Sequence, residues 1–276
     1  MSPVDSDEQD LTRKQRREQA RSQRKALEQA EVASAARRTR LTQLGIVVAV
    51  VVVAIVAVLV ASGGSSSKPP PTGSPPANKI SREVSGFLAG IPQSASTLGS
   101  PTAPVTIQYF GDLECPICKD FTVGGALPTI VQNWVRPGKV KIEYRSLETA
   151  TKEPEVFKTQ QTAALAAGKQ NKMWSFIELF YHEQGEENSG YVTENYLQGL
   201  AQQVPGLNVS QWSSARSEPA LANQVATDAQ AANNAGFTGT PSFLIGKTGG
   251  TMAKLGEVSV TDPAPFNQAI EKALKS

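Results

Sequence analysis

Two cysteines three positions apart carry the clearest chemistry in this sequence. Cys115 and Cys118, in the order Cys115-Pro116-Ile117-Cys118, are the only cysteines, and His182 is the only histidine. Two thiols and one imidazole are one ligand short of a closed tetrahedral zinc site unless a carboxylate joins them. A disulfide-stapled scaffold would need more cysteines. The pair is therefore predicted to be a redox-active disulfide that works with no metal and no other cofactor.

The spacing of the pair predicts one attacking and one resolving sulfur. A strand-like run, Val105 to Phe110, ends shortly before Cys115, and Pro116 suits the first position of a helix, where no N–H donor is needed. In a first helical turn, positions i and i+3 bring their Cα atoms near the ~5.5 Å that a disulfide spans. The helix start stabilises a thiolate on Cys115, whereas Cys118 lies one turn further in. We therefore predict that Cys115 attacks and Cys118 resolves.

Other interpretations of these residues stay open. A structural disulfide that closes a two-residue gap would restrict the unfolded chain little and so stabilise little. Half of a metal site and two reduced packing cysteines are the remaining alternatives. His182, between Tyr181 and Glu183 late in a predicted helix, is interpreted as a surface or helix-terminal residue and not as a catalytic one.

The N-terminal part of the chain predicts a membrane anchor. Residues 1–43 form a basic tail, and residues 44–61 are 18 apolar residues that would span about 27 Å as a helix. A cleaved signal peptide is the alternative, but its apolar region is usually shorter and follows a short basic start. Arginines beside residue 44 place the N-terminus in the cytoplasm. Residues 62–79, rich in Gly, Ser and Pro, are predicted to be a disordered linker that tethers the domain at residues 80–276.

The net charge of the chain and the hydrophobic periodicity of the domain give further predictions. The chain carries 27 basic and 25 acidic residues, a net charge of +2, so no nucleic-acid partner is predicted. Hydrophobic patterns predict a β-α-β unit with strands at residues 105–110 and 139–146, and the helical stretch from Cys115 is expected to be broken or bent at Pro128. Helices are predicted around residues 154–168, 171–184, 193–203, 208–217 and 219–235, an all-helical insertion at about 151–236. Two strands, at 242–245 and 251–256, and a final helix ending near Lys275 follow.

Three separate stretches make the chain resemble the DsbA-like branch of the thioredoxin superfamily. They are APVTIQYFGDLECPICKDF at 103–121, GKQNKMWSFIELFYHEQ at 168–184 and AGFTGTPSFLIG at 235–246. The resemblance implies an α/β thioredoxin fold with a helical insertion and a protein thiol:disulfide oxidoreductase. It also implies that Thr240-Pro241 forms a cis-proline loop facing the disulfide, where an extended substrate peptide pairs with the backbone.

Two departures from the family bear on redox tuning. Strongly oxidising members often have His in the variable dipeptide, here Pro116-Ile117, and a buried Glu commonly precedes the first cysteine by six residues, where this chain has Tyr109. Asp112 and Glu114 are also close to Cys115 in sequence, and an acid beside a thiolate opposes it. These features predict a milder oxidant.

The predicted function is disulfide exchange with exported proteins, most simply as an oxidase. A reductase or isomerase of the same fold, and a non-catalytic binding or chaperone module at the membrane, are the alternatives. The expected partners are unfolded or partly folded exported proteins and a membrane recycling protein, either a quinone-linked oxidase or a thiol-reducing transporter. The domain is expected outside the cell membrane, to which one helix anchors it.

Overall fold

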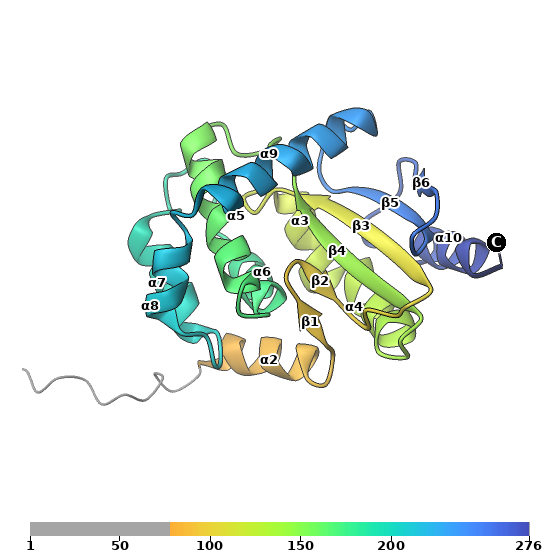
Figure 1. The fold of residues 1–276 in the computed structure, drawn as a ribbon, viewed down its shortest axis with the longest axis horizontal. Helices are drawn as coiled ribbons and strands as arrows, with labels where there is room; N and C mark the ends of the chain where they lie inside the picture. The colour runs from red at the N-terminus through yellow and green to blue at the C-terminus, as the bar shows by residue number, and fades with distance from the viewer. Residues whose placement is uncertain (1–77, 276) are drawn as a thin grey trace, which may run out of the picture. The chain divides into compact units, whose positions relative to one another are not determined.

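A computed structural model describes residues 78–275 of the chain. A mixed six-stranded sheet with the order β1-β2-β4-β3-β5-β6 forms its centre (Figure 1). The strands are β1 (Gln93–Ser94), β2 (Thr97–Leu98), β3 (Val105–Gly111), β4 (Val140–Ser146), β5 (Ser242–Lys247) and β6 (Met252–Lys254). Cys115 comes four residues after the end of β3, so the cysteine pair lies at that end of the sheet.

β3 is the central strand that the sequence predicts. It pairs in parallel with β4, with Val105 opposite Val140, and antiparallel with β5 on its other side. All of its residues except Gln108 are buried, as expected for a strand covered on both faces. β4 instead alternates buried and half-buried residues, which matches its alternating sequence.

Helices cover both faces of the sheet. The two faces of β3 have separate apolar clusters: Tyr109 packs in the main core, and Phe110 packs with residues of and next to α9. The helices are α2 (Lys79–Leu88), α3 (Pro116–Lys119), α4 (Ala126–Ile130), α5 (Pro154–Gly168), α6 (Met173–His182), α7 (Glu194–Gln203), α8 (Val209–Ala215), α9 (Pro219–Asn234) and α10 (Ala264–Lys275). Two π-helical turns, η1 (Asp120–Gly124) and η2 (Val131–Val135), follow α3 and α4.

The helix that starts after Cys115 is interrupted at Gly125, so the break or bend predicted at Pro128 is wrong. Pro128 lies in the first turn of α4, where a missing N–H leaves no hydrogen bond unmade. At Gly125 a Cβ atom would come within 2.5 Å of the Asp120 carbonyl oxygen and 2.6 Å of the Val260 carbonyl oxygen. The chain near Val260 approaches closely enough to accept a hydrogen bond from the Ala126 N–H at 2.9 Å.

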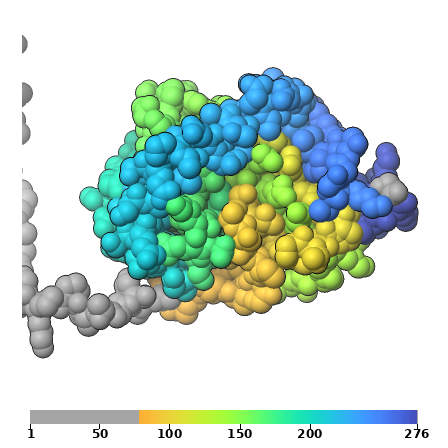
Figure 2. Space-filling model, viewed as in Figure 1, coloured from red at the N-terminus to blue at the C-terminus, as the bar shows by residue number. Residues whose placement is uncertain are grey.

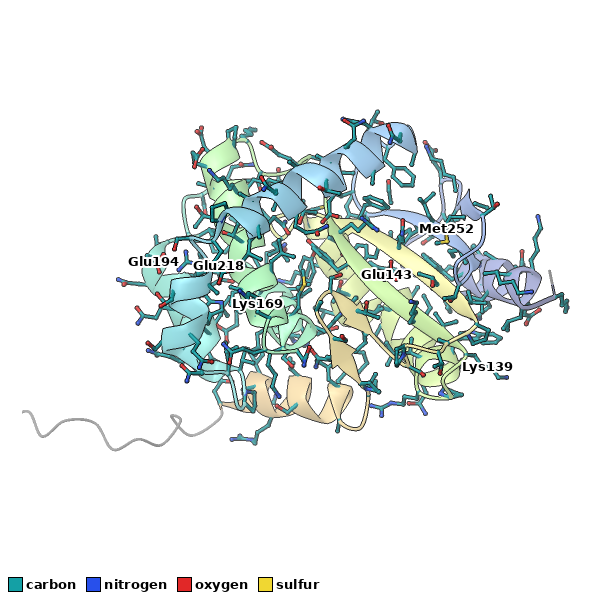
Figure 3. The ribbon with its side chains drawn as sticks, viewed as in Figure 1. Lys139, Glu143, Lys169, Glu194, Glu218 and Met252 are labelled. Atoms are coloured by element: carbon teal, nitrogen blue, oxygen red, sulfur yellow. The ribbon has the colours of Figure 1, made fainter. Side chains whose placement is uncertain are left out.

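Helices α5 to α9 form the predicted helical insertion beside the sheet (Figure 1). Trp212 is buried and donates from its indole nitrogen to the Ala163 carbonyl oxygen at 2.8 Å, which joins α8 to α5. The ion pairs Lys169–Glu218 and Arg216–Glu194 connect the insertion helices. Lys169, Glu218 and Glu194 are labelled in Figure 3. α9 lies across this surface (Figure 2), with only four of its residues buried.

Two features near the start of the domain differ from the sequence prediction. α2 begins at Lys79 with Asn78 as its N-cap, inside the range assigned to the linker. The β1–β2 hairpin was not predicted, because two-residue strands carry no periodicity. It is held by tertiary contacts: the Gln93 side chain accepts a hydrogen bond from the Trp174 N–H at 3.2 Å.

Within residues 78–275, no helix has the length and apolar character needed to cross a membrane. The predicted tail, anchor and most of the linker, residues 1–77, lie outside the described residues.

Candidate active site

Cys115 is the N-cap of α3. Its backbone is extended, with φ −70° and ψ 119°, and its Sγ accepts a hydrogen bond from the Cys118 N–H at 3.4 Å. Pro116 occupies the first helical position, as the sequence predicts. The first sulfur therefore caps the helix itself, where the free N–H groups favour negative charge.

The Thr240–Pro241 loop faces this sulfur. The Thr240–Pro241 peptide bond is cis, and the Cys115 thiol donates to the Thr240 carbonyl oxygen at 3.4 Å. Residues 125 positions apart in sequence thus meet at one point. The role of Thr240 and Pro241 in substrate binding remains a prediction.

The two thiols have very different acidities. Both cysteines are free and buried, with 5% of Cys115 and 0% of Cys118 exposed. The hydrogen bond with the Cys118 side chain, aided by Thr240, lowers the pKa of Cys115 from 9.0 to about 7 against the opposing effect of burial. Burial raises the pKa of Cys118 well above 9.0. At neutral pH a substantial fraction of Cys115 is therefore a thiolate nucleophile, while Cys118 stays a protonated thiol.

Gln184, just after α6, holds the turn that carries Cys115. Its side-chain nitrogen donates to the Leu113 carbonyl oxygen at 2.7 Å and to the Cys115 carbonyl oxygen at 3.1 Å. Lys119 in turn donates to the Gln184 carbonyl oxygen at 3.4 Å. Sequence reasoning did not identify Gln184, because a polar residue after a helix carries no sign of a partner 69 positions away.

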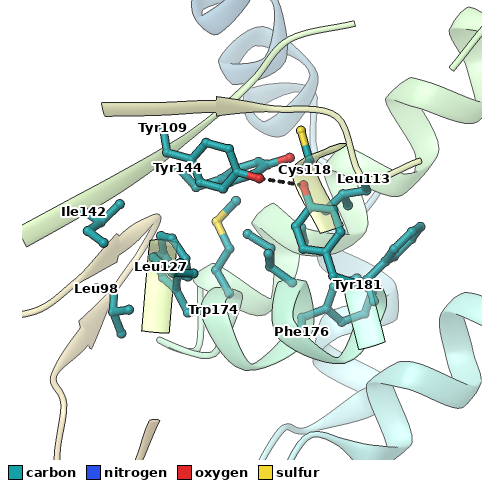
Figure 4. Packing of buried hydrophobic residues seen from close by; sticks show 14 of the residues in the cluster. Leu98, Tyr109, Leu113, Cys118, Leu127, Ile142, Tyr144, Trp174, Phe176 and Tyr181 are labelled. Carbon is teal, nitrogen blue, oxygen red and sulfur yellow. Dashed lines mark hydrogen bonds between the residues drawn. The ribbon is translucent and has the colours of Figure 1, made fainter. Parts of the chain in front are cut away.

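Three buried phenols surround the second cysteine (Figure 4). Tyr109, Tyr144 and Tyr181 gather beside Cys118, and the Tyr109 and Tyr181 hydroxyls are 3.1 Å apart. Burial raises the pKa of each phenol well above 10.0. The phenols therefore stay neutral, so the position where the family commonly has an acid here holds a hydrogen-bonding group without charge.

A surface hollow opens beside the pair. It measures about 430 Å³, and its lining includes Ile117, Phe237, Thr240, Pro241, Leu255 and Val258. Ile117 is 52% exposed, the most exposed large apolar side chain among the described residues. The lining also includes Ser242, Lys254 and Glu257, so the hollow offers polar and charged groups as well as apolar ones next to the reactive sulfur.

His182 is the last residue of α6. It is half-buried, and burial lowers the pKa of its imidazole; Lys119 also lowers this pKa, whereas Glu83 and Glu183 raise it. Among the described residues, no hydrogen bond connects His182 to either cysteine. Its position at the end of α6 agrees with the helix-terminal position expected from the sequence.

Comparison with known families agrees with this fold. The sequence model of a thioredoxin family, described as Thioredoxin, matches residues 93–253. The chain belongs to this thioredoxin family. The matched range includes both cysteines, the Thr240–Pro241 loop and the whole helical insertion.

Relatives and solved structures refine the assignment. The chain is 25% identical over 182 residues to a probable disulfide bond formation protein D of Bacillus cereus, covering 65% of this chain and 78% of that protein. It is 26% identical over 153 residues to disulfide bond formation protein D of Bacillus subtilis, covering 54% and 66%. The oxidised BdbD crystal structure from Bacillus subtilis has the same fold, with a TM-score of 0.57 and 23% identity over 67% of this chain and 97% of that one. This thioredoxin-family chain is a protein thiol:disulfide oxidoreductase.

Proposed function

We propose that this protein is an extracytoplasmic oxidase that introduces disulfides into exported proteins through Cys115 and Cys118. The observation that carries the proposal is the asymmetry of the pair: a helix-capping sulfur with a pKa of about 7 beside a buried sulfur with a raised pKa. The Bacillus relatives, which are named for disulfide bond formation, support the oxidising direction.

The oxidising reaction proceeds in two exchanges. A substrate thiolate attacks Cys115 Sγ of the enzyme disulfide, a substrate–Cys115 disulfide forms, and the bonding electron pair leaves with Cys118 Sγ, which takes up a proton. A second substrate thiolate then attacks the substrate sulfur of the mixed disulfide. The substrate leaves oxidised, and Cys115 leaves as a thiolate, stabilised at the helix start.

Substrate contacts are proposed at the Thr240–Pro241 loop and the adjoining hollow. An extended peptide would pair with the Thr240 backbone next to Cys115, while its apolar side chains contact Ile117 and the lining of the hollow. In this arrangement the substrate peptide is recognised by its backbone and by its apolar side chains, both of which are accessible in unfolded or partly folded proteins.

We further propose that residues 44–61 anchor the chain in the cell membrane, with residues 1–43 inside and the thioredoxin domain outside. An enzyme that leaves each cycle reduced needs a reoxidising partner, and a membrane protein linked to quinones would meet it there.

Oxidative refolding tests the proposed function. The full-length chain, oxidised beforehand, is expected to restore activity to reduced, unfolded ribonuclease, whereas the Cys115→Ser/Cys118→Ser variant does not. The reduction potential of the pair is measured in parallel against glutathione. Faster reduction of insulin than oxidation of ribonuclease, with a potential near that of a reductase, would reject the oxidase in favour of the reductase. No exchange in either assay would favour a binding module.

A further inference from the structure

Asp112 is a buried acid in the turn between β3 and Cys115. It is 0% exposed, and its carboxylate is surrounded by donors. One oxygen accepts the backbone N–H groups of Thr149, Ala150 and Thr151 at 3.1, 2.9 and 2.9 Å. The other accepts the Glu114 N–H at 3.1 Å and the Thr151 hydroxyl at 2.7 Å.

All of these donors are neutral groups. A buried carboxylate is costly unless its oxygens are satisfied, and here three successive N–H groups converge on one oxygen in the manner of a backbone anion nest. The carboxylate thereby fixes the loop that follows β4, residues 147–151, against the turn that carries Cys115.

This loop reaches the Thr240–Pro241 loop. The Thr149 and Thr240 hydroxyls are 2.5 Å apart, and the Thr240 carbonyl oxygen accepts from the Cys115 thiol at 3.4 Å. The Asp112 carbonyl oxygen, in turn, accepts from the Cys115 N–H at 3.1 Å. The contacts form a closed circuit that starts at Cys115, passes through Asp112, Thr149 and Thr240, and returns to Cys115.

We propose that Asp112 is a positioning residue for protein substrates, which sets the Thr240 edge relative to Cys115 through Thr149. This inference rests on the proposed exchange at Cys115. A peptide must lie along Thr240 while its sulfur attacks Cys115, so both must be held in register. A small thiol such as glutathione needs less of that edge.

The circuit makes a quantitative prediction for two substrates. The probes are reduced glutathione and an unfolded peptide with one cysteine, and the measurement is the rate constant for attack on the oxidised full-length chain. In each reaction the Cys115–Cys118 bond breaks, a bond to the probe sulfur forms, and Cys118 takes the electron pair and a proton. The ratio of the peptide rate to the glutathione rate isolates the contribution of the substrate edge, because a general loss of folded protein lowers both rates equally.

Two variants break the circuit at different points. Asp112→Asn keeps the shape but turns one oxygen into an N–H donor that faces N–H groups, and we expect the ratio to fall about tenfold. Thr149→Val removes the hydroxyl contact with Thr240 and keeps the Thr149 N–H, and we expect a fall of about threefold.

Asp228→Asn is the matched control. Asp228 is also buried, at 2% exposure, and also accepts a backbone N–H, that of Ser146 at 3.0 Å, but it belongs to α9 and its partners lie outside the circuit. The ratio in this variant is expected to equal that of the wild type.

The outcomes separate the possibilities. An unchanged ratio in Asp112→Asn and Thr149→Val, or an equal fall in Asp228→Asn, overturns the proposal. A fall in Asp112→Asn alone overturns the route through Thr149, and Thr149→Val decides if Asp112→Asn does not fold. A wild-type chain that reacts with neither probe would instead reject the exchange chemistry itself, and the positioning role with it.

Discussion

At the scale of single residues, the difference between the two cysteines comes from position more than from neighbouring charge. Asp112 and Glu114 are close to Cys115 in sequence, yet Asp112 accepts hydrogen bonds from the 149–151 loop and Glu114 accepts one from the Asn188 N–H at 3.2 Å. Cys115 nevertheless has a pKa of about 7. Hydrogen bonds with Cys118, Thr240 and the Ile117 backbone lower this pKa against the opposing effect of burial. The opposition expected from the two acids therefore does not prevent a lowered pKa.

The pKa of Cys115 predicts how its reactivity depends on pH. The thiolate fraction rises as the pH rises through about 7, so the alkylation rate of the reduced protein with iodoacetamide should rise with a midpoint there. Because the largest cause of the lowered pKa is the Cys118 side chain, Cys118→Ala should move the midpoint upward, toward 9.0. An unmoved midpoint would contradict that assignment.

The roles of the two sulfurs predict unequal trapping of substrates. Cys118→Ala cannot form the enzyme disulfide, so its Cys115 thiolate attacks disulfides of exported proteins: one substrate sulfur bonds to Cys115 and the other leaves as a thiolate. Because Cys118 is absent and cannot release the bound substrate, these mixed disulfides should accumulate and disappear on adding dithiothreitol. Cys115→Ala should trap few or none, because Cys118 is fully buried. Trapping is best assayed near pH 8, since Cys118→Ala also raises the pKa of Cys115. Equal trapping by both variants would refute the division of roles.

Ile117 offers a place to tune the potential. Its side chain is 52% exposed between the cysteines, so Ile117→His should be accommodated and should stabilise the thiolate by charge or by its N–H. We expect the reduction potential to rise by at least about 30 mV, equivalent to ~1.4 kcal/mol of stabilisation of the reduced form. Ile117→Phe, a ring without an N–H, is the control. A potential that stays the same or falls would show that this position does not tune the pair.

At the scale of elements, the sequence predicts segments with strong periodicity and misses features that depend on distant contacts. The helices of the insertion and the strands β3, β4 and β5 lie close to their predicted ranges. The β1–β2 hairpin was missed because it depends on α6, and the break at Gly125 because it depends on the chain near Val260. The same holds for the site. The cysteines could be identified from their spacing, whereas Gln184 and Thr149 could not, because their partners lie far along the chain.

The break at Gly125 has a direct test with a neighbouring control. Gly125→Ala would place a Cβ within 2.6 Å of two carbonyl oxygens, and we expect a loss of about 2 kcal/mol in the free energy of unfolding. Gly124→Ala meets nothing within 4 Å, so it should be neutral or slightly stabilising. Urea unfolding followed by tryptophan fluorescence measures both. Equal effects would mean that the close approach of Val260 is not what requires a glycine.

At the scale of the whole molecule, the enzyme and its proposed location are supported by different parts of the chain. The chemistry lies within residues 78–275, where the thioredoxin fold and its helical insertion position the cysteine pair. The location rests on the sequence before it: an apolar run with basic residues on one side and a Gly, Ser and Pro-rich stretch on the other. An oxidase on such a tether would stay close to a membrane partner while it reaches emerging substrates.

The tether predicts a defined pattern of protease protection. We expect that the membrane fraction holds the uncleaved chain, and that mass spectrometry finds peptides from residues 1–43, because the apolar run is longer than that of a usual signal peptide and starts far from the N-terminus. A protease site inserted at residues 62–79 and cut from outside intact cells should release the thioredoxin domain in soluble form, while a tag at the N-terminus stays protected. The same chain without the inserted site is the control. A mature protein that begins near Gly64, with no peptide from the basic tail, would show that residues 44–61 are removed as a signal peptide, and the domain would then act without a membrane anchor of its own.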